Sequence, residues 1–258
     1  MKWIIFLILL AGTSALSAED SVPAGTVLPV RLNTTIDSNK AHPGDVITGT
    51  ITQDVPLAAG QVIRAGSKVT GHVVKVFESR HQLPAKIALT FDTVAIGGKE
   101  VQIRTDLRAI AGYVELEQAE IPIDGPDRGT PASAWTTAQI GGSDIVYRGG
   151  GPVANSTGTV GRPVANGVLS TVSAQPGMSC RGEVGGNSAL QALWLFSSNA
   201  CGVYGMKDLE IVHAGRTEPA GEVVLASRQP QLKLPSGTGI LLRVNAPSTS
   251  SASAELEH

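Results

Sequence analysis

The chain has 258 residues, a formal net charge of −2, 30 glycines, 15 prolines and only 4% aromatic residues. Neither sign of charge forms a long block, which excludes a phosphate-binding face, so no nucleic-acid partner is expected. The many glycines and prolines, and the absence of long runs of Ala, Glu, Lys and Leu, favour an all-β protein with many turns.

The first residues have the pattern of a secretory signal peptide. Met1 and Lys2 give a positive start, residues 3–10 are an unbroken apolar run, and small residues follow up to Ala18. The run is too short for a mature membrane anchor, and no later stretch has the length and apolarity of a transmembrane helix. We therefore expect residues 1–18 to be cleaved and the protein to be periplasmic, outer-membrane-associated or secreted, without an integral membrane segment.

Two segments at opposite ends of the chain share a pattern. Residues 21–33 read "SVPAGTVLPVRLN" and residues 231–245 read "QLKLPSGTGILLRVN". Each has a Pro-x-Gly-Thr turn followed by alternating apolar residues, the mark of a strand with one buried face. Pro29 within the first strand indicates an edge position or a bulge there. We predict that the two strands share one sheet and close a small antiparallel β-barrel.

Short strands at regular spacing are predicted between these ends. The segment "RAGS" is a looser copy of the turn, and Gly97-Gly98 predicts a tight hairpin. The strands are expected within residues 45–55, 62–76, 85–96 and 99–107. We predict a discontinuous barrel domain formed by residues 19–110 and 220–246.

Residues 111–219 differ in composition, being rich in Gly, Pro, Ser and Asn with three short apolar runs. The middle run, "ALQALWLFSS", fits either a strand or a two-turn helix. Cys180 and Cys201 bracket it, and an even pair in an oxidising compartment predicts a disulfide, although two free buried thiols are the alternative. Such a bridge is worth about 3 kcal/mol in the chain-entropy view. We predict an inserted Gly-rich, disulfide-stapled β subdomain, and a disordered tail over residues 247–258.

The sequence contains no recognisable catalytic or metal-binding pattern. None of the five histidines has metal-ligand spacing, and no Gly-x-Ser-x-Gly elbow occurs. Asp37, Asp45 and Asp54 lie near expected strand ends, where Asp usually serves the turn. We therefore expect no enzymatic activity, no cofactor and no metal; the alternative is a secreted hydrolase whose site has no sequence motif.

The insert also carries six of the ten aromatic residues of the chain. Trp194 and Phe196 are expected to form its small core. Trp135 and Tyr147 stand in Gly- and Pro-rich loops, and Arg148 follows directly, so these three are the predicted partner-binding residues. The expected function is a non-catalytic binding or assembly module for an unidentified protein or glycan partner in the envelope, with self-association left open.

The order of several segments resembles a known family. Residues 22–55, the stretch "VIRAGSKVTGHVV" and the stretch "LPSGTGILLRVN" resemble the C-terminal β-barrel of the TrbI-like proteins of conjugation and type IV secretion. The whole chain is also similar to exported bacterial proteins of unknown function that carry "SCRG…QALWLFSSNACGVYG". The resemblance covers residues 22–107 and 221–245, and it implies a barrel and a place in a secretion or conjugation envelope complex.

The departures from that family limit what the resemblance implies. Its members have an inner-membrane helix, a long Pro-rich spacer and an inserted helical hairpin that forms a pore. This chain has an expected signal peptide, almost no spacer and a Gly-rich insert. The resemblance therefore implies the barrel and not the channel.

Overall fold

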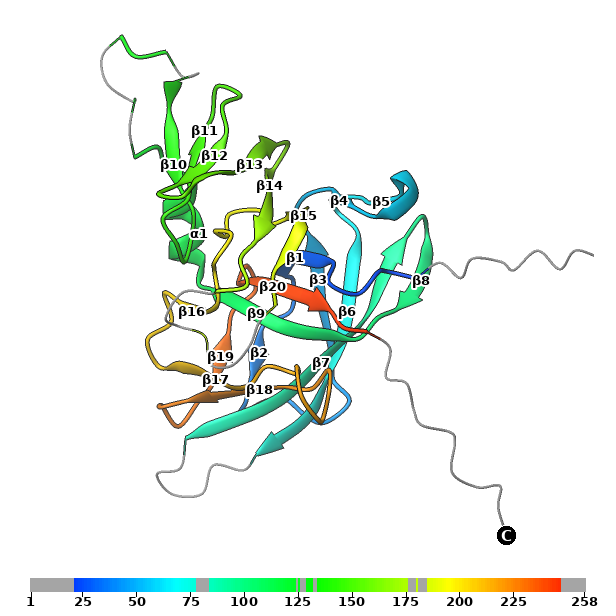
Figure 1. Cartoon of the computed structure of the whole chain (residues 1–258). Coiled ribbons are helices and arrows are strands. Elements are labelled where there is room, and N and C mark those ends of the chain that lie inside the picture. The colour runs from blue at the N-terminus through cyan, green and yellow to red at the C-terminus, as the bar shows by residue number, and fades with distance from the viewer. Residues whose placement is uncertain are drawn as a thin grey trace, which may run out of the picture.

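The computed structural model describes residues 21–77, 84–123, 125, 129–131, 134–175, 180 and 185–246. The expected signal peptide and the expected tail lie outside these residues. Strands dominate the described chain, together with one α-helix, α1 (Tyr113–Glu120), and one 3-10 turn, η1 (Ala58–Gly60). The predicted all-β fold, a barrel-like sheet with a disulfide-stapled β insert, is confirmed (Figure 1).

The larger sheet is a nearly closed barrel with the strand order β16-β9-β20-β1-β3-β6-β7-β18-β17. β8 also pairs with β7 but stands outside this order. All its pairings are antiparallel except that of β9 with β16. Its strands are β1 (Val27–Leu32), β3 (Val46–Ile51), β6 (Lys68–Phe77), β7 (Ala85–Ile96), β8 (Lys99–Gln102), β9 (Thr105–Ala111), β16 (Gly202–Tyr204), β17 (Leu209–His213), β18 (Val223–Ser227) and β20 (Gly239–Val244).

The first and last strands of the described chain pair directly, as predicted. β1 and β20 are antiparallel partners from Val27↔Arg243 to Arg31↔Gly239. The barrel nearly closes elsewhere, where β16 and β17 end the strand order and follow one another in the chain. There the Leu107 N–H of β9 donates to the Ala214 carbonyl at 2.8 Å, just past β17. The end of the predicted insert thus contributes two strands to the barrel sheet.

The prediction that Pro29 marks an edge or a bulge is wrong. β1 lies between β20 and β3, and no register shift occurs in either ladder. The ladder with β3 covers only Val30, Arg31 and Leu32. Pro29 stands just beyond that ladder, so its missing N–H leaves the ladder complete.

The repeated turns have one function. In the turns that open at Pro23, Arg64 and Pro235, the fourth residue donates its N–H back to the first residue's carbonyl at 3.0–3.2 Å. The third residue is a glycine with φ between 85° and 91°, and its N–H donates to a neighbouring strand at 2.8 Å. The stretch His42–Asp45 is a fourth copy that the sequence pattern did not reveal: Gly44 has φ 91° and donates to Val73. Each turn therefore launches a strand and joins it to the sheet in one step.

The insert forms a second, six-stranded antiparallel sheet in which each strand pairs with the next along the chain. Its strands are β10 (Thr136–Ala138), β11 (Ile145–Tyr147), β12 (Val153–Asn155), β13 (Gly158–Val164), β14 (Gly167–Val172) and β15 (Asn187–Ala192). The ambiguous apolar run enters as the end of strand β15 and not as a helix. Two short two-stranded pairs complete the described strands: β2 (Ile36–Asp37) with β19 (Lys233–Leu234), and the hairpin of β4 (Val55–Pro56) with β5 (Val62–Ile63).

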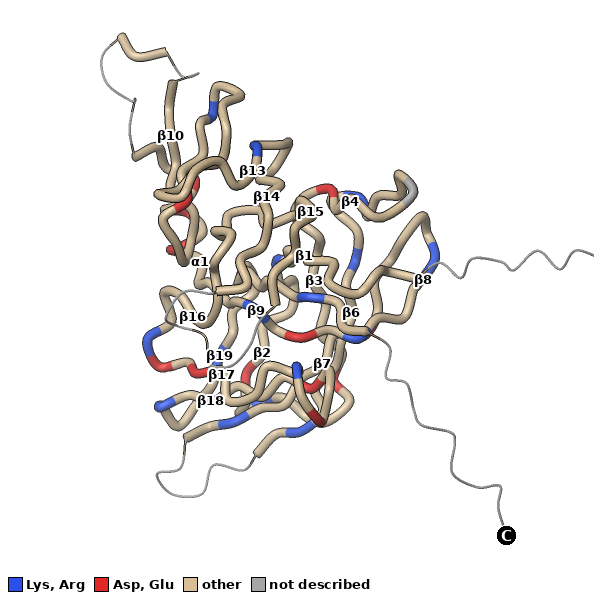
Figure 2. Tube along the Cα trace, in the orientation of Figure 1, with Lys and Arg blue, Asp and Glu red and all other residues tan. Residues whose placement is uncertain are grey.

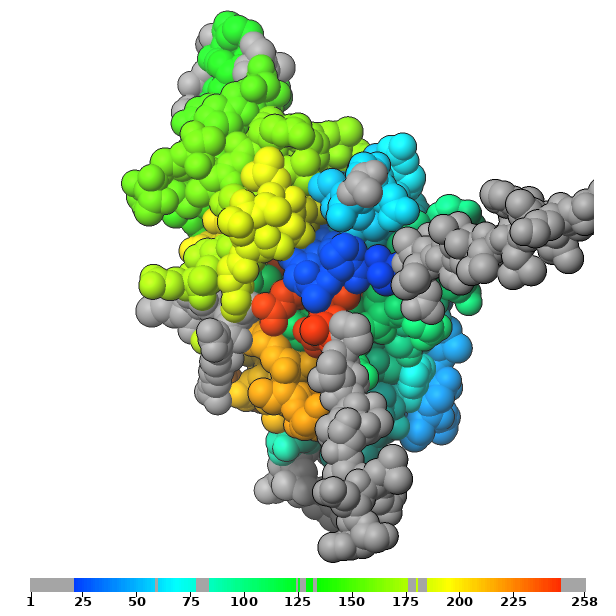
Figure 3. Space-filling view, turned by 45° about the vertical axis from the view of Figure 1, so that its right-hand side comes forward, coloured from blue at the N-terminus to red at the C-terminus, as the bar shows by residue number. Residues whose placement is uncertain are grey.

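Two apolar clusters hold the molecule together. The first fills the barrel and includes Leu28, Val30 and Leu32 of β1. The second lies between the barrel's outer surface and the insert, where Val27 and Leu241 meet insert residues. The insert residues of this second cluster include Val146, Val153, Val168, Leu193, Trp194 and Phe196. In Figure 3 the insert stacks on the barrel, with β15 against β1 and the β4–β5 hairpin. Strands β1, β9 and β20 are therefore covered on both faces.

We predict that Gly71→Ala lowers the free energy of unfolding by about 1–3 kcal/mol, the usual cost of overpacking. A Cβ at Gly71 would collide with the Thr90 backbone carbonyl of β7, and backbone cannot rotate away as a side chain does. Denaturant unfolding measures the loss. Gly112→Ala is the matched control, because its Cβ would sit at an ordinary 3.4 Å from Met206. Equal stability of the two variants would contradict the prediction.

Candidate functional site

The predicted disulfide between Cys180 and Cys201 is present, with 5.1 Å between the two Cα atoms and 21 residues of separation. Cys201 is fully buried and directly precedes β16, which joins the barrel sheet beside β9. Its N–H donates to the Tyr204 hydroxyl, and that hydroxyl donates back to the Cys201 carbonyl at 2.8 Å. The bridge therefore fixes the place where the insert returns to the barrel.

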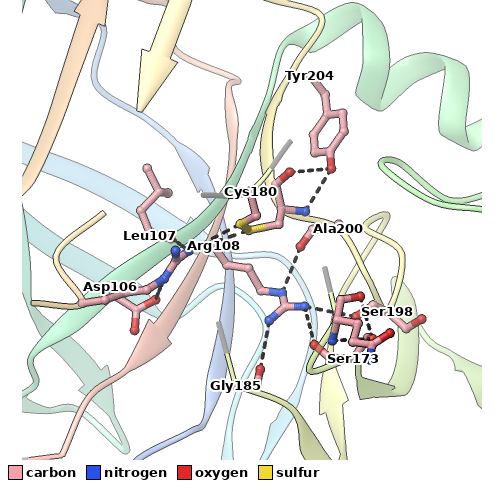
Figure 4. The surroundings of a disulfide bond; sticks show 12 residues. Asp106, Leu107, Arg108, Ser173, Cys180, Gly185, Ser198, Ala200 and Tyr204 are labelled. Carbon is pink, nitrogen blue, oxygen red and sulfur yellow. Dashed lines mark hydrogen bonds and ion pairs between the residues drawn. A yellow bond between two sulfur atoms is a disulfide. The ribbon is translucent and has the colours of Figure 1, made fainter. Parts of the chain in front are cut away.

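Arg108 lies next to this bridge and is fully buried. In the β9–β20 ladder Leu241 faces Ala109 and Leu242 faces Leu107, so Arg108 is the extra residue of a β-bulge. A bulge re-aims one side chain, and here the guanidinium points into the loops of the insert. It donates to four backbone carbonyls at 2.9–3.4 Å, as Figure 4 shows: Ala200, Gly185, Ser173 and Ser198.

Burial, together with the positive charges of Arg243 and Arg216, lowers the pKa of Arg108 to about 10. The guanidinium still carries its charge at neutral pH. Its hydrogen bonds are therefore charge-assisted, and each is stronger than a neutral one. Because all four acceptors belong to the insert's loops, we assign Arg108 a structural role.

Asp106 is the buried carboxylate of this region. It accepts from Arg243 at 2.9 Å, and Arg216 lies 3.5 Å from its other oxygen. Burial raises the pKa of Asp106, while the two guanidinium groups act in the opposite direction. Arg216 also donates to the Leu107 carbonyl and lies 3.7–3.8 Å from both disulfide sulfurs. The charges thus belong to one network that ties β9, β20 and the disulfide together.

The three predicted partner-binding residues come together at one end of the insert sheet. Thr136 of β10 faces Tyr147 of β11, and the Arg148 N–H donates to the Trp135 carbonyl at 2.8 Å. Tyr147 is 41% exposed, whereas Trp135 is half-buried. Their role in binding stays a prediction. Of the three, only Arg148 lines a cavity described below.

Gln53, which no sequence pattern indicated, joins the two sheets. It follows β3 of the barrel and is fully buried. Its amide nitrogen donates to the Val168 carbonyl at 2.8 Å, and its amide oxygen accepts the N–H groups of Val168 and Trp194. A Cβ at Gly167 would strike this amide, so the glycine is needed for the close approach. Trp194 takes a left-handed backbone with φ 53° at the same point.

A groove of about 640 Å³ opens beside the Gln53 bridge, between the barrel and the insert. The barrel supplies Arg31, the ends of β3 and the turn before β6. The insert supplies Gln139, Arg148 and Trp194, and α1 supplies Glu120. The Arg31 guanidinium lies 5.0 Å from the centre of the Trp194 ring, a cation–π contact that holds it at the rim.

Several polar groups of the groove have no hydrogen-bond or ion-pair partner within the described chain. Gln139 is 5% exposed, and its buried side-chain oxygen accepts no hydrogen bond there. Neither Arg31 nor Arg148 lies within 4.0 Å of a carboxylate among the described residues. Charged residues are otherwise sparse in the insert sheet (Figure 2). This concentration of unpaired groups at one hollow makes the groove the candidate binding site.

An apolar slot of about 320 Å³ adjoins the groove. Asn166, in the β13–β14 hairpin, lines both cavities. The slot is otherwise formed by Asp54, Pro56, Val62, Val164, Ala165 and Leu169. The two hollows are therefore neighbours, and together we call them the track: the groove is its polar half and the slot is its apolar half.

Among the described residues, no group of three or more His, Cys, Asp or Glu side chains is placed to hold a metal ion. The helices of the described chain include none with the length and apolarity needed to cross a membrane. No protein-family model matches the chain, and no curated protein matches it.

We predict that Arg108→Lys lowers the free energy of unfolding by about 2–4 kcal/mol. Lysine keeps the charge, but its single nitrogen cannot reach four carbonyls, and buried acceptors left unpaired cost about 1–3 kcal/mol each. Thermal or denaturant unfolding measures the effect, with Arg104→Lys as the partly exposed control. A variant as stable as the control would remove Arg108 from its structural role.

Gln53→Met should lower the free energy of unfolding by about 2–4 kcal/mol, because it leaves the buried N–H groups of Val168 and Trp194 unpaired at nearly constant volume. Trp194 should also become less rigidly held, which its fluorescence emission reports. Gln61→Met, on the exposed loop before β5, is the control. An unchanged stability would show that the apolar cluster alone holds the insert in place.

Proposed function

We propose that the protein is a non-catalytic, exported module of the cell envelope or the secreted fraction that binds a partner, a protein or a glycan, at the groove between barrel and insert. The observation that carries this proposal is a set of groups there that have no hydrogen-bond or ion-pair partner among the described residues: the guanidinium groups of Arg31 and Arg148 and the buried amide oxygen of Gln139. A buried acceptor without a partner costs about 1–3 kcal/mol, which a ligand donor would recover.

The frame around the groove favours binding. Gln53 and Arg108 fix the insert to the barrel through buried hydrogen bonds, so the two walls of the groove are held in position before any ligand arrives. A preformed site loses less conformational entropy on binding. The groove volume of about 640 Å³ also falls in the range usual for ligand sites.

The lining of the groove favours binding over hydrolysis. Among the described residues that line it, Glu120 is the only carboxylate, and no histidine is present. A hydrolase of the acid–base type needs two such groups within reach of the substrate. The groove offers instead two cations and several amides and hydroxyls, the usual means of recognising a partner.

An extracytoplasmic location is part of the proposal. The pattern of residues 1–18 is that of a signal peptide, and a structural disulfide is typical of oxidising compartments. The resemblance to the TrbI-like barrel supports a second candidate function, a component of a secretion or conjugation envelope complex. The same groove would then be a contact surface within that complex.

The proposal predicts that Arg148→Glu weakens partner binding at least tenfold while the fold is retained, because Arg148 is exposed and reversing its charge repels an anionic group. Immobilised full-length protein and its variants would be used to capture partners from envelope extract, and the captured material would be titrated. Arg162→Glu, exposed on β13 and away from the groove lining, is the charge-matched control. Equal loss in both variants, or no loss in either, would contradict binding at the groove.

A further inference from the structure

We propose that the ligand of the groove is an extended peptide that places an Asp or Glu side chain in the polar half of the track and an aliphatic side chain in the adjoining apolar slot. This inference rests on the proposed function and names its ligand class. It is argued from three features: two arginines without an ion-pair partner among the described residues, the buried acceptor, and the lining residue Asn166 that the two hollows share.

The polar half is built for a carboxylate. Arg31 and Arg148 come from different sheets and both line the groove. A guanidinium offers parallel N–H donors that match the two oxygens of a carboxylate. The Trp194 ring holds the Arg31 guanidinium at 5.0 Å, which leaves the edges of the guanidinium to donate. Glu120, at the end of α1, also lines the groove and repels a second acidic group on its side, so it limits how an acidic ligand can orient.

The buried oxygen of Gln139 requires a donor. A peptide backbone supplies an N–H at every residue except proline, so a chain laid along the groove can satisfy it once the Gln139 amide rotates toward the groove. A simple anion such as phosphate at neutral pH has mainly acceptor oxygens and suits the arginines better than this amide oxygen. The amide oxygen therefore favours a ligand that carries both a carboxylate and N–H groups.

The apolar slot adds the second side chain. Pro56 and Val62 come from the β4–β5 hairpin, and Val164 and Leu169 come from the β13–β14 hairpin. Asn166 lies between the two hollows and lines both, so neighbouring residues of one short peptide can occupy them. Burying an aliphatic side chain there contributes binding energy that an acidic group alone would lack.

The same features favour a peptide over an oligosaccharide. Sugars commonly bind by stacking on an open aromatic face, but Trp194 is only 4% exposed and Arg31 covers its ring. The methyl and acetamido groups that sugars carry are also smaller than the aliphatic side chain that the slot would take. The peptide is thus the class that uses all of the track.

The test is to pan a displayed random heptapeptide library against the full-length protein. We expect enriched sequences with Asp or Glu within two positions of Leu, Ile, Val or Met. A synthetic peptide with the consensus should lose at least tenfold in affinity when its acidic residue is replaced by the corresponding amide. The acidic consensus peptide should also bind Arg148→Glu protein at least tenfold more weakly than it binds the original protein. Its affinity for Arg162→Glu protein should be unchanged.

A second variant tests the apolar slot. Ala165 is exposed on the hairpin and lines the slot, so Ala165→Asp introduces a charge there with little effect on folding. It should weaken the consensus peptide at least fivefold, whereas Ala24→Asp, exposed in the turn before β1, should not. Circular dichroism would confirm that both variants are folded.

Four results would overturn the inference. A consensus without an acidic residue would show that the ligand needs no carboxylate. Peptides that bind Arg148→Glu as well as the original protein would show that no ligand carboxylate lies beside Arg148. Binding of acidic oligosaccharides alone, sensitive to Arg148→Glu, would overturn the peptide class and leave the proposed function standing. No Arg148-dependent binding of peptides, oligosaccharides or envelope components would overturn both.

Discussion

The structure depends on the burial of three barrel strands from both sides. Most strands of a small barrel have one face in the core and one in water, but β9 is buried at every position. Leu107 and Ile110 point into the barrel, while Ala109 and Ala111 face the insert. Removal of the insert would expose an apolar patch on these strands. The barrel and the insert are therefore one packed unit.

Two buried polar side chains then set the register between the two parts. Apolar contacts are non-directional and would allow the insert to slide over the barrel. Gln53 and Arg108 prevent this, because each joins backbone groups across the interface and any shift would leave those groups buried and unpaired. β16 and β17 nearly close the barrel next to the disulfide. They hold the other end of the same junction in place.

The groove is a consequence of this arrangement. The insert sheet stacks against the barrel at the β15 end, and its other strands extend away from the barrel (Figure 1). The two walls diverge beside the Gln53 bridge, where Arg31, Arg148 and Gln139 face one hollow. Because those walls are fixed by buried hydrogen bonds, the polar groups are held apart and cannot satisfy one another. The site is therefore polar, preformed and open to a ligand.

The sequence by itself determined the local features. Alternating apolar residues and Pro-x-Gly-Thr turns predicted the strands and the pairing of β1 with β20, because a strand with one buried face must alternate. The two cysteines predicted the disulfide. Tyr147 is exposed, but it ends strand β11 and does not lie in the loop that the composition predicted, and its predicted role in binding is untested. Only the tertiary structure decided how the parts meet. The contacts of Arg108 and Gln53 each depend on a partner more than 90 residues away. The interior place of Pro29 depends on where the neighbouring strand β3 ends its pairing with β1. A lone buried glutamine, or an arginine within an apolar strand, has no local pattern, since its meaning lies in the backbone groups that the folded chain brings to it.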